Sequence, residues 1–582
     1  MVSDLTLLLH PALPLLLAAV AVRFVPRVVG HVLMVAAPLA ALAAVFALDL
    51  GTSVEVGWFD WQLEVLRVDG LARPFGIIFA IAGVIAGTYG IRTMGRNERA
   101  SALAYAGAAL GVVFAGDLIT FFVFWEVKAV ASTLLVLARR TPLSGRAGMR
   151  YLYMHVLGGK LLLAGIVWHY TATGSMAFTG FEVSTGGVLI LLACLISAAV
   201  PPLHAWLPDA YPEATVAGTV FLSAYTTKAA VYALARGFAG WEVLVYLGIA
   251  MALYGVVYAV LENDIRRLLG YHIISQVGYM VAGVGIGTQL AINGATAHAF
   301  AHILYKGLLL MGAGAVIYAT GRSKMSALGG IANRMRTVLV LYLIGAASIS
   351  SVPFFSGFVA KELVVEGAYV DERIWLVILL QIASVGTFLH TGLKLPYGAW
   401  FGHDGLGPRT NDEGHRIHVG AVPRTMIVAM GLSAALNFGI GIAPNLLYDL
   451  LPYPVDYSAY SVGKVLEKTQ ILVFTALAFF LLLDQLHAKA MVTVDTDWLY
   501  RRLPRTVATL ARRGRTDRDP VESPAAPDPA PRGRLVAART AVLARVASRD
   551  PDGPPPVAAT WTLGSVLLGA AVVILLVSLV WP

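Results

Sequence analysis

The amino-acid sequence predicts an all-α polytopic membrane protein. Of its 582 residues, 58% are hydrophobic and 13% are charged, roughly half the charged fraction of a typical soluble protein. Apolar runs of about 20 residues, the length that spans a bilayer, recur along the whole chain. Because these runs are continuous and do not alternate with polar residues, strands are excluded for most of the chain.

The runs predict about 14–16 transmembrane helices. The first run has no basic start and no small-residue cleavage site, so we expect it to be retained as a helix and not removed as a signal peptide. The single cysteine, Cys194, excludes an internal disulfide framework and a multi-cysteine metal cluster. The predicted spans are residues 4–24, 29–49, 71–91, 100–116, 118–138, 150–173, 183–200, 215–237, 241–262, 266–289, 292–319, 335–360, 372–401, 421–445, 469–488 and 561–581.

Proline and glycine interrupt two of these segments. PPLHAWLPDAYPEAT separates spans 183–200 and 215–237, and TGLKLPYG lies within span 372–401. A broken helix at membrane depth is tolerated where it lines a cavity or packs on protein. We therefore expect both breaks to face the interior of the helix bundle.

Loop charges predict the orientation of the chain. Basic residues follow the first, third, fifth, ninth and eleventh spans, whereas intervening loops such as GTSVEVGWFDWQLEV are acidic or neutral. Because cytoplasmic loops carry the excess of Lys and Arg, we expect a multi-pass protein of the inner (plasma) membrane with its N-terminus outside. The net charge of +9 comes mainly from these loops and a basic tail, so it does not indicate nucleic-acid binding.

The composition changes after residue 488. Residues 489–560 contain DPVESPAAPDPAPRGR, which is typical of a flexible linker. The basic stretches on either side of it either form amphipathic helices on the cytoplasmic membrane surface or belong to a partly disordered tail. Residues 561–581 are predicted to form a separate final anchor.

Two ionisable residues lie near the middle of span 118–138. Glu126 in FFVFWEVKAV costs at least about 2.5 kcal/mol on insertion scales, so it is expected to face a partner or a hydrated cavity. The alternative is a protonated carboxyl group that is hydrogen-bonded to a neighbouring helix. Lys128 lies about 200° further round the helix, so it needs its own partner, snorkels to the interface, or has a structural role.

The segment HAFAHILYKGLLLMGAG places three titratable side chains on one helix stripe. His298, His302 and Lys306 follow one another at every fourth position, which aligns them on one face. Because imidazoles titrate near neutral pH, this stripe predicts a proton wire. A metal site is the alternative, but no carboxylate or cysteine accompanies the histidines on the stripe.

Other ionisable residues also lie inside apolar segments. Desolvation lowers the pKa of a buried lysine and a nearby carboxylate restores it, so Lys–Glu pairs are suited to passing protons along. Many such groups near the membrane midplane indicate a hydrated polar axis. These residues are Lys228, Lys361 beside Glu362, His390 with Lys394, and His155 with Lys160. His155 and Lys160 also fit a structural role.

Sequence motifs of nucleotide-binding proteins, metalloproteases and serine hydrolases are absent. It contains no Walker A loop, Rossmann glycine fingerprint, HExxH motif or nucleophile elbow. We therefore expect no cofactor, no metal and no enzymatic activity of the chain on its own. Its energy source would be an ion gradient or a partner subunit.

Six ordered segments carry a resemblance to a known family. The chain is similar to the antiporter-like membrane subunits shared by respiratory complex I and Mrp-type multisubunit cation/proton antiporters, over roughly residues 70–400. It looks most like the D-type member of the Mrp subunits, whereas the tail and the extra last span resemble the longer complex I subunit. The segments are LITFFVFWE, PPLHAWLPDAYPEAT, TTKAAVYALARG, NDIRRLLGYHIISQVGYM, HAFAHILYKGLLLMGAG and PFFSGFVAKE.

The resemblance implies two inverted five-helix repeats with broken helices around a central polar axis. It implies the following roles: Glu126 as the gate for proton uptake, Lys228 as the eighth-helix lysine, His298, His302 and Lys306 as the central relay, and Lys361 on the exit side. It also divides the chain into N-terminal helices (1–99), an antiporter-like core (100–401), C-terminal helices (402–488), a basic cytoplasmic segment (489–560) and a final anchor (561–582).

One position departs from the family pattern. Ser197 stands where the family usually has a lysine that partners the glutamate corresponding to Glu126. Lys128 and Lys160 are the candidate replacements, and Lys160 is favoured because spans 118–138 and 150–173 are joined by a short loop. If neither serves, the first half-channel is altered or silent.

Three functions are compatible with the sequence. The first is a proton-translocating subunit of a multisubunit Na+/proton antiporter, which works with other membrane subunits. The second is a proton-pumping subunit of a redox-driven complex of the complex I, hydrogenase or formate lyase type. The third is a non-transporting scaffold, for which Ser197 is the only support.

Overall fold

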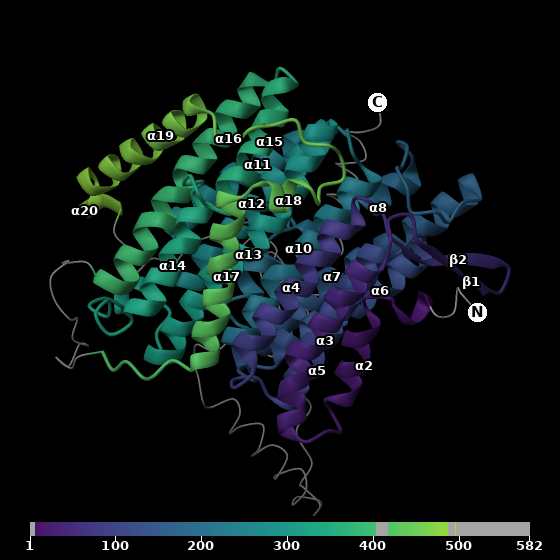
Figure 1. The fold of residues 1–582 in the computed structure, drawn as a ribbon, viewed down its shortest axis with the longest axis horizontal. Coiled ribbons are helices and arrows are strands. Elements are labelled where there is room, and N and C mark those ends of the chain that lie inside the picture. The colour runs from purple at the N-terminus through teal and green to yellow at the C-terminus, as the bar shows by residue number, and fades with distance from the viewer. Residues whose placement is uncertain (1–5, 403–416, 487–494, 496–582) are drawn as a thin grey trace, which may run out of the picture. The chain divides into compact units, whose positions relative to one another are not determined.

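A computed structural model describes residues 6–402, 417–486 and 495 (Figure 1). The described helices belong to one compact unit, Met1–Thr493. The predicted segment 489–560, apart from Asp495, and the predicted anchor 561–582 lie outside the described residues. Within the described part, nine helices are long and apolar enough to cross a membrane, which confirms an α-helical, multi-pass membrane protein.

The N-terminal region contains α2 (Leu13–Ala21), α3 (Arg27–Ala47) and α4 (Ala72–Gly90). The first predicted span is shortened because the chain turns within HPALP before α2 begins. Between α3 and α4, β1 (Ser53–Trp58) and β2 (Trp61–Arg67) form an antiparallel hairpin where the sequence predicts a plain loop. The period-two alternation of these short segments is a strand signal that the loop interpretation overlooked.

Five helical segments follow the N-terminal region. They are α5 (Arg96–Phe114), α6 (Leu118–Leu137), α7 (Pro142–Thr173), α8 (Thr185–Ala198) with the short α9 (Trp206–Ala210), and α10 (Val216–Gly237). Asp117 fixes the start of α6, because its Oδ1 accepts hydrogen bonds from the backbone N–H groups of Ile119 and Thr120, each at 2.8 Å. The predicted break is present, since α8 ends at Ala198 before the proline pair.

A second group contains α11 (Val243–Leu261), α12 (Ile265–Ile286), α13 (Gln289–Thr320), α14 (Arg336–Ile349), α15 (Ser356–Val370) and α16 (Ile374–Thr387). The span predicted over 335–360 is interrupted between α14 and α15, because Ser351 and Phe354 take positive φ on either side of Pro353. The break predicted within 372–401 is instead a helical continuation through the π-helical turns η2 (Phe388–Lys394) and η3 (Tyr397–Phe401).

Helix lengths and helix caps of the first group recur in the second group at a constant sequence separation. Helices α7 and α13 each contain 32 residues, begin after a threonine N-cap and end at a glycine with positive φ. An aspartate caps the preceding helix, α6 or α12, in the same way. The cap pairs are Thr141 and Thr288, Gly174 and Gly321, and Asp117 and Asp264, and each pair is 147 residues apart (288 − 141, 321 − 174 and 264 − 117).

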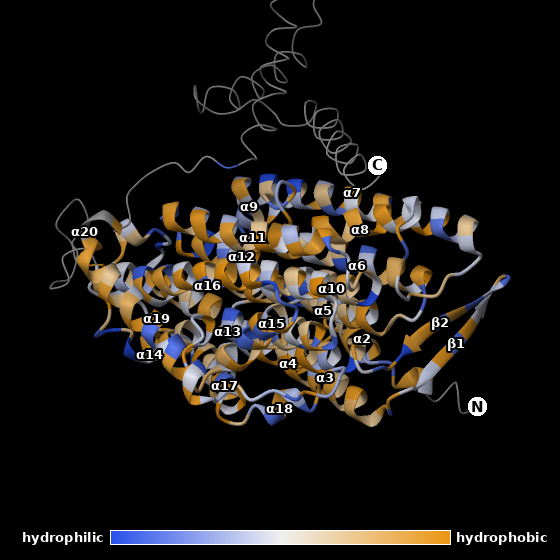
Figure 2. Cartoon of the chain, turned by 90° about the horizontal axis from the view of Figure 1, so that it is seen from above, coloured by the Kyte–Doolittle hydropathy of each residue, from blue (hydrophilic) through white to orange (hydrophobic). Residues whose placement is uncertain are grey.

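Helix α13 is central to the packing of the described part. It packs against α4, α10, α12, α14, α15 and α17 (Arg424–Ile442). The outer helices α7, α11 and α16 carry long apolar stretches (Figure 2), with Val167, Val257 and Ile378 exposed. Helices α18 (Asn445–Tyr448), α19 (Val462–Leu481) and α20 (Leu483–Leu486) complete this unit.

Candidate functional site

The predicted stripe on α13 is buried. His298, His302 and Lys306 are each 0% exposed, and the His298 and His302 ring centroids are 6.2 Å apart. His298 Nε2 lies 2.8 Å from the Tyr305 hydroxyl and 3.2 Å from Gln276 Oε1. Lys306 Nζ has no hydrogen-bond partner among the described residues.

Lys228 approaches this stripe from α10. It is fully buried, and its Nζ donates to the Ser223 backbone oxygen at 2.7 Å and to Thr227 Oγ1 at 3.2 Å. It interacts electrostatically with His302 and Lys306. The structure therefore brings Lys228 close to the α13 stripe.

Lys361 lies on α15 beside the helix break. Its Nζ donates to the Ile349 backbone oxygen at 2.8 Å and lies 5.2 Å from the centroid of the Tyr279 ring. Ile349 is the last residue of α14, whose terminal carbonyl groups have no partner within that helix. The neighbouring Glu362 is engaged elsewhere, since its Oε1 lies 2.6 Å from Lys468 Nζ of α19. The sequence did not single out Lys468.

The structure adds two residues on α12 that the sequence analysis missed. The His272 ring centroid is 5.6 Å from that of His390 in η2, and His272 also interacts electrostatically with Lys306. Gln276 lies one turn further along α12 and contacts His298. The sequence carried a signal for them: His272 and Gln276 stand four residues apart in YHIISQVGYM, which places both on one face of a helix. Thus His272 connects the central stripe to the predicted pair His390 and Lys394, both of which are buried.

Glu126 is half-buried on α6 and packs against α7. A Cβ atom at Gly159 would overlap Glu126 Oε1, so the carboxylate fills the space that a side chain at Gly159 would need. Oε1 has no hydrogen-bond partner in the described part of the chain. Lys128 and Lys160 both attract this carboxylate, with Lys128 the stronger of the two.

Lys128 lies in the interior on another face of α6. It is 0% exposed, and its Nζ sits 3.3 Å from the centroid of the Trp125 ring, a favourable cation–π geometry. It interacts electrostatically with His155 of α7. As helix geometry predicts, Glu126 and Lys128 therefore occupy different surroundings.

The two other residues named for this half-channel are arranged differently. Lys160 is exposed on α7. Ser197 is 1% exposed on α8 and lies one turn beyond Cys194. Of the two candidate replacements for the missing lysine, Lys128 is therefore the buried one.

A chain of hydroxyl groups begins beside His155. The imidazole stacks on the Tyr151 ring with the centroids 4.1 Å apart. The Tyr151 hydroxyl bonds Ser132 Oγ at 2.9 Å and Thr226 Oγ1 at 3.2 Å, and Thr226 Oγ1 bonds the Tyr105 hydroxyl at 2.6 Å. All five side chains are buried, so a hydrogen-bonded path links α7 to the helix that carries Lys228.

The chain is similar in sequence to known membrane proteins. Residues 115–387 match the family described as NADH:quinone oxidoreductase/Mrp antiporter, TM. The D subunit of the Na(+)/H(+) antiporter of Alkalihalophilus pseudofirmus is 29% identical over 417 residues, which cover 66% of this chain and 83% of that protein. NADH-quinone oxidoreductase subunit N of Desulforudis audaxviator is 31% identical over 360 residues, which cover 56% of this chain and 71% of that protein.

Solved structures share the fold. A chain in the Mrp complex from Dietzia sp. DQ12-45-1b superposes with a TM-score of 0.69 at 24% identity and covers 81% of this chain and 99% of that one. A chain of the membrane-bound sulfane sulfur reductase, an archaeal respiratory membrane complex, gives the same TM-score at 23% identity, with coverage of 98% and 99%.

Proposed function

Because the chain belongs to the NADH:quinone oxidoreductase/Mrp antiporter family, we propose that it is the proton-translocating membrane subunit of a multisubunit Na+/proton antiporter. In broader terms, it is an antiporter-like membrane subunit of the kind found in Mrp-type and complex I-type assemblies. Its partners are the other membrane subunits of such an assembly.

One observation carries this proposal: buried titratable side chains follow one another across the interior. Lys228 adjoins the stripe of α13, and His272 connects that stripe to the His390 side of η2. Ionisable groups inside a membrane are costly and mark ion or proton pathways. We assign Glu126 to proton uptake, the Lys228–His302–Lys306 group to transfer, and Lys361 together with His390 and Lys394 to the release side.

Lys128 replaces the cation that Ser197 does not supply. It is the buried one of the two candidate lysines, whereas Lys160 is exposed, so the geometry favours Lys128 over Lys160. Its neighbour His155 stands 147 residues before His302 (302 − 155), the same spacing that relates the helix caps. His155 therefore corresponds to a residue of the central relay, and the pair Lys128 and His155 keeps the first half-channel working.

The same spacing supports two repeats, α5–α10 and α11–η3. Each repeat contains five membrane segments, of which the fourth is broken (α8–α9 and α14–α15). Because five crossings reverse the side of the membrane on which the chain emerges, the second repeat is inverted relative to the first. We propose that the N-terminus is outside and the basic loops are cytoplasmic.

The function is tested in everted membrane vesicles that contain the complete complex, with a pH-sensitive dye reporting proton flux on addition of NaCl. Glu126→Gln keeps the shape of the side chain and removes its charge, so cation-dependent flux is expected to vanish. His169→Gln is the control, because His169 lies on α7 outside the chain of buried groups. Wild-type flux from Glu126→Gln would contradict the proposed role.

A redox-driven complex is the second candidate. The reductase chain covers 98% of this protein, against 81% for the Mrp chain, so a redox-linked relative matches its length better. Neighbouring genes for iron–sulfur and flavin subunits, and flux driven by an electron donor without Na+, would favour this function. A scaffold role instead requires that Lys306→Ala and Lys361→Ala leave ion transport intact.

A further inference from the structure

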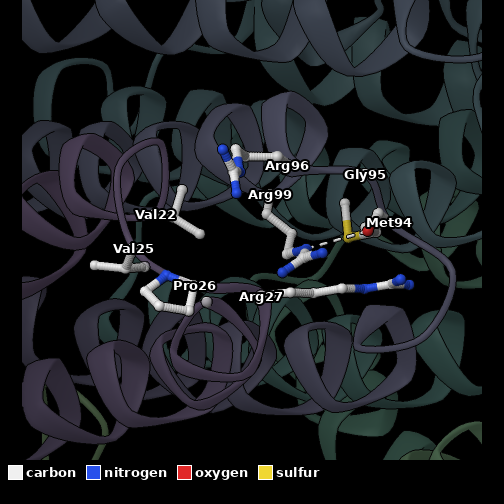
Figure 3. A pocket seen from close by; sticks show the side chains of 9 residues that line it. Val22, Val25, Pro26, Arg27, Met94, Gly95, Arg96 and Arg99 are labelled. Atoms are coloured by element: carbon white, nitrogen blue, oxygen red, sulfur yellow. Dashed lines mark hydrogen bonds between the residues drawn. The ribbon is translucent and has the colours of Figure 1, made fainter.

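A basic cavity lies where α2 and α4 end and α3 and α5 begin, outside the chain of buried titratable groups. Its volume is about 240 Å³, and Arg27, Arg96 and Arg99 line it together with apolar side chains (Figure 3). In Figure 3 the guanidinium group of Arg99 lies between the side chains of Arg96 and Arg27. The proton path uses none of these three residues.

The guanidinium groups are not neutralised by residues that the structure describes. Arg99 is only 4% exposed, and its Nε donates to the Met94 backbone oxygen at 3.1 Å. Arg96 Nη1 donates to the Arg23 backbone oxygen at 3.3 Å. No described carboxylate forms an ion pair with Arg27, Arg96 or Arg99. The Arg99 end groups therefore retain capacity to donate to an anion.

The nearest carboxylate is already engaged. Glu98 adjoins Arg99 in the sequence, but its carboxylate accepts hydrogen bonds from Thr215 Oγ1 and from the backbone N–H of Gly95, the latter at 3.3 Å. Arg27 and Arg96 each repel Arg99 more strongly than Glu98 attracts it. Grouping three cations in a half-closed space is unfavourable unless an anion joins them, and guanidinium–phosphate contacts are among the strongest charge-assisted hydrogen bonds.

One helix N-terminus adds to the positive potential. Helix α3 begins at the cavity, and its N-cap residue, Pro26, makes no side-chain cap hydrogen bond, whereas the start of α5 is capped by Glu98. Free backbone N–H groups and the positive end of the helix dipole favour an anion at this position. Side chains and backbone thus favour the same kind of ligand.

We propose that this cavity binds a phosphate group. An anionic phospholipid is the source that fits the surroundings, because Phe24 (83% exposed) and Val28 (72% exposed), which adjoin the lining residues Val25 and Arg27 in the sequence, offer exposed apolar surface for acyl chains. Basic pockets at the ends of transmembrane helices bind phospholipid headgroups in this manner. Free inorganic phosphate shares the chemistry and is distinguished by experiment.

The test is native mass spectrometry of the purified complete complex, titrated in separate samples with phosphatidylglycerol, phosphatidylcholine and inorganic phosphate. We expect saturable binding of phosphatidylglycerol, with about tenfold weaker binding in Arg27→Gln and in Arg99→Gln. Binding of inorganic phosphate with the same sensitivity to these variants would support the phosphate site and identify the free anion as its source. Arg146→Gln is the matched control, because Arg146 is an exposed arginine in the first turns of α7.

A second variant distinguishes loss of the phosphate site from misfolding of the protein. A Cβ atom at Gly30 would lie 2.9 Å from Arg99 Nη1, so Gly30→Ala displaces the guanidinium end and keeps its charge. It should weaken phosphate binding by several fold, while Arg99→Lys should restore part of the binding lost in Arg99→Gln. Equal binding by the wild type and all variants would overturn the proposal. Loss of partner subunits from Arg99→Gln with unchanged phosphate binding would also overturn it, because the cavity would then receive an acidic side chain.

Discussion

At the scale of single residues, Glu126 and Lys128 show how two neighbouring charges acquire different roles. Glu126 lies against the backbone of α7, where Gly159 leaves room for its carboxylate. Lys128 lies inside the bundle over Trp125. Both charges were evident from the sequence, and so was their divergence around the helix. The role of Gly159 was not, because a glycine needed for its empty space has no sequence signature of its own.

Gly159→Ala is expected to abolish most of the cation-dependent proton flux. The new methyl group would overlap the Glu126 carboxylate, and a displacement of about 1 Å at a reacting group lowers rates by up to about 100-fold. Flux in everted vesicles measures the effect. Gly158→Ala is the matched control, because a methyl group at Gly158 would have its nearest neighbour, Ile196 Cγ2, at 3.6 Å. Equal flux in the two variants would contradict the proposed fit.

Lys128→Met is expected to reduce proton flux by about tenfold or more, as loss of a proton-transfer group does, whereas Lys160→Met changes it less than about twofold. The double variant Lys128→Met with Ser197→Lys should recover part of the flux, because Ser197 is buried one turn from Cys194. Flux is measured at equal levels of assembled complex. If Lys160→Met were the damaging change, the assignment of Lys128 would be wrong.

At the scale of helices, the sequence predicted segments whose ends carry strong signals. The prolines after Ala198 marked a break that the structure contains. The break between α14 and α15 was missed, because Pro353 is flanked by apolar residues and the whole stretch has the length of one span. Conversely, Pro396 suggested a break, but π-helical turns accommodate it. Hydropathy therefore located membrane segments better than it located their interruptions.

The ion pair between α19 and α15 gives a prediction at this scale. Lys468→Met leaves Glu362 without the ammonium group that lies 2.6 Å from it, and unpairing a buried charge costs about 3–5 kcal/mol. We expect the purified complex to have a lower melting temperature. Intrinsic tryptophan fluorescence during heating measures it. The double variant Glu362→Met with Lys468→Met should regain most of the loss. A double variant no more stable than Lys468→Met would show that the pair does not hold α19 in place.

At the scale of the whole molecule, the proposed proton path follows the internal repeat of the chain. The spacing of 147 residues between the caps of α7 and α13 also relates His155 to His302, so the two halves place an imidazole at matching positions. The halves differ in charge: α13 carries Lys306, whereas the corresponding position of α7 is Gly159 (306 − 147). The glycine that accommodates Glu126 thus occupies the place of the relay lysine. Sequence patterns showed each half separately, but the correspondence depends on helix ends that only the structure defines.

The orientation of the whole chain can be tested by cysteine labelling. The native Cys194 is 1% exposed, so the unmodified protein should not react with a membrane-impermeant maleimide. Asp60 lies at the exposed tip of the β1–β2 hairpin, and Arg146 is exposed near the N-terminal end of α7; each is replaced by cysteine. Because basic loops remain in the cytoplasm, Asp60→Cys should be labelled in intact cells and Arg146→Cys only after permeabilisation. The reverse pattern would place the N-terminus in the cytoplasm, and the arginine-lined cavity would then face the outer leaflet.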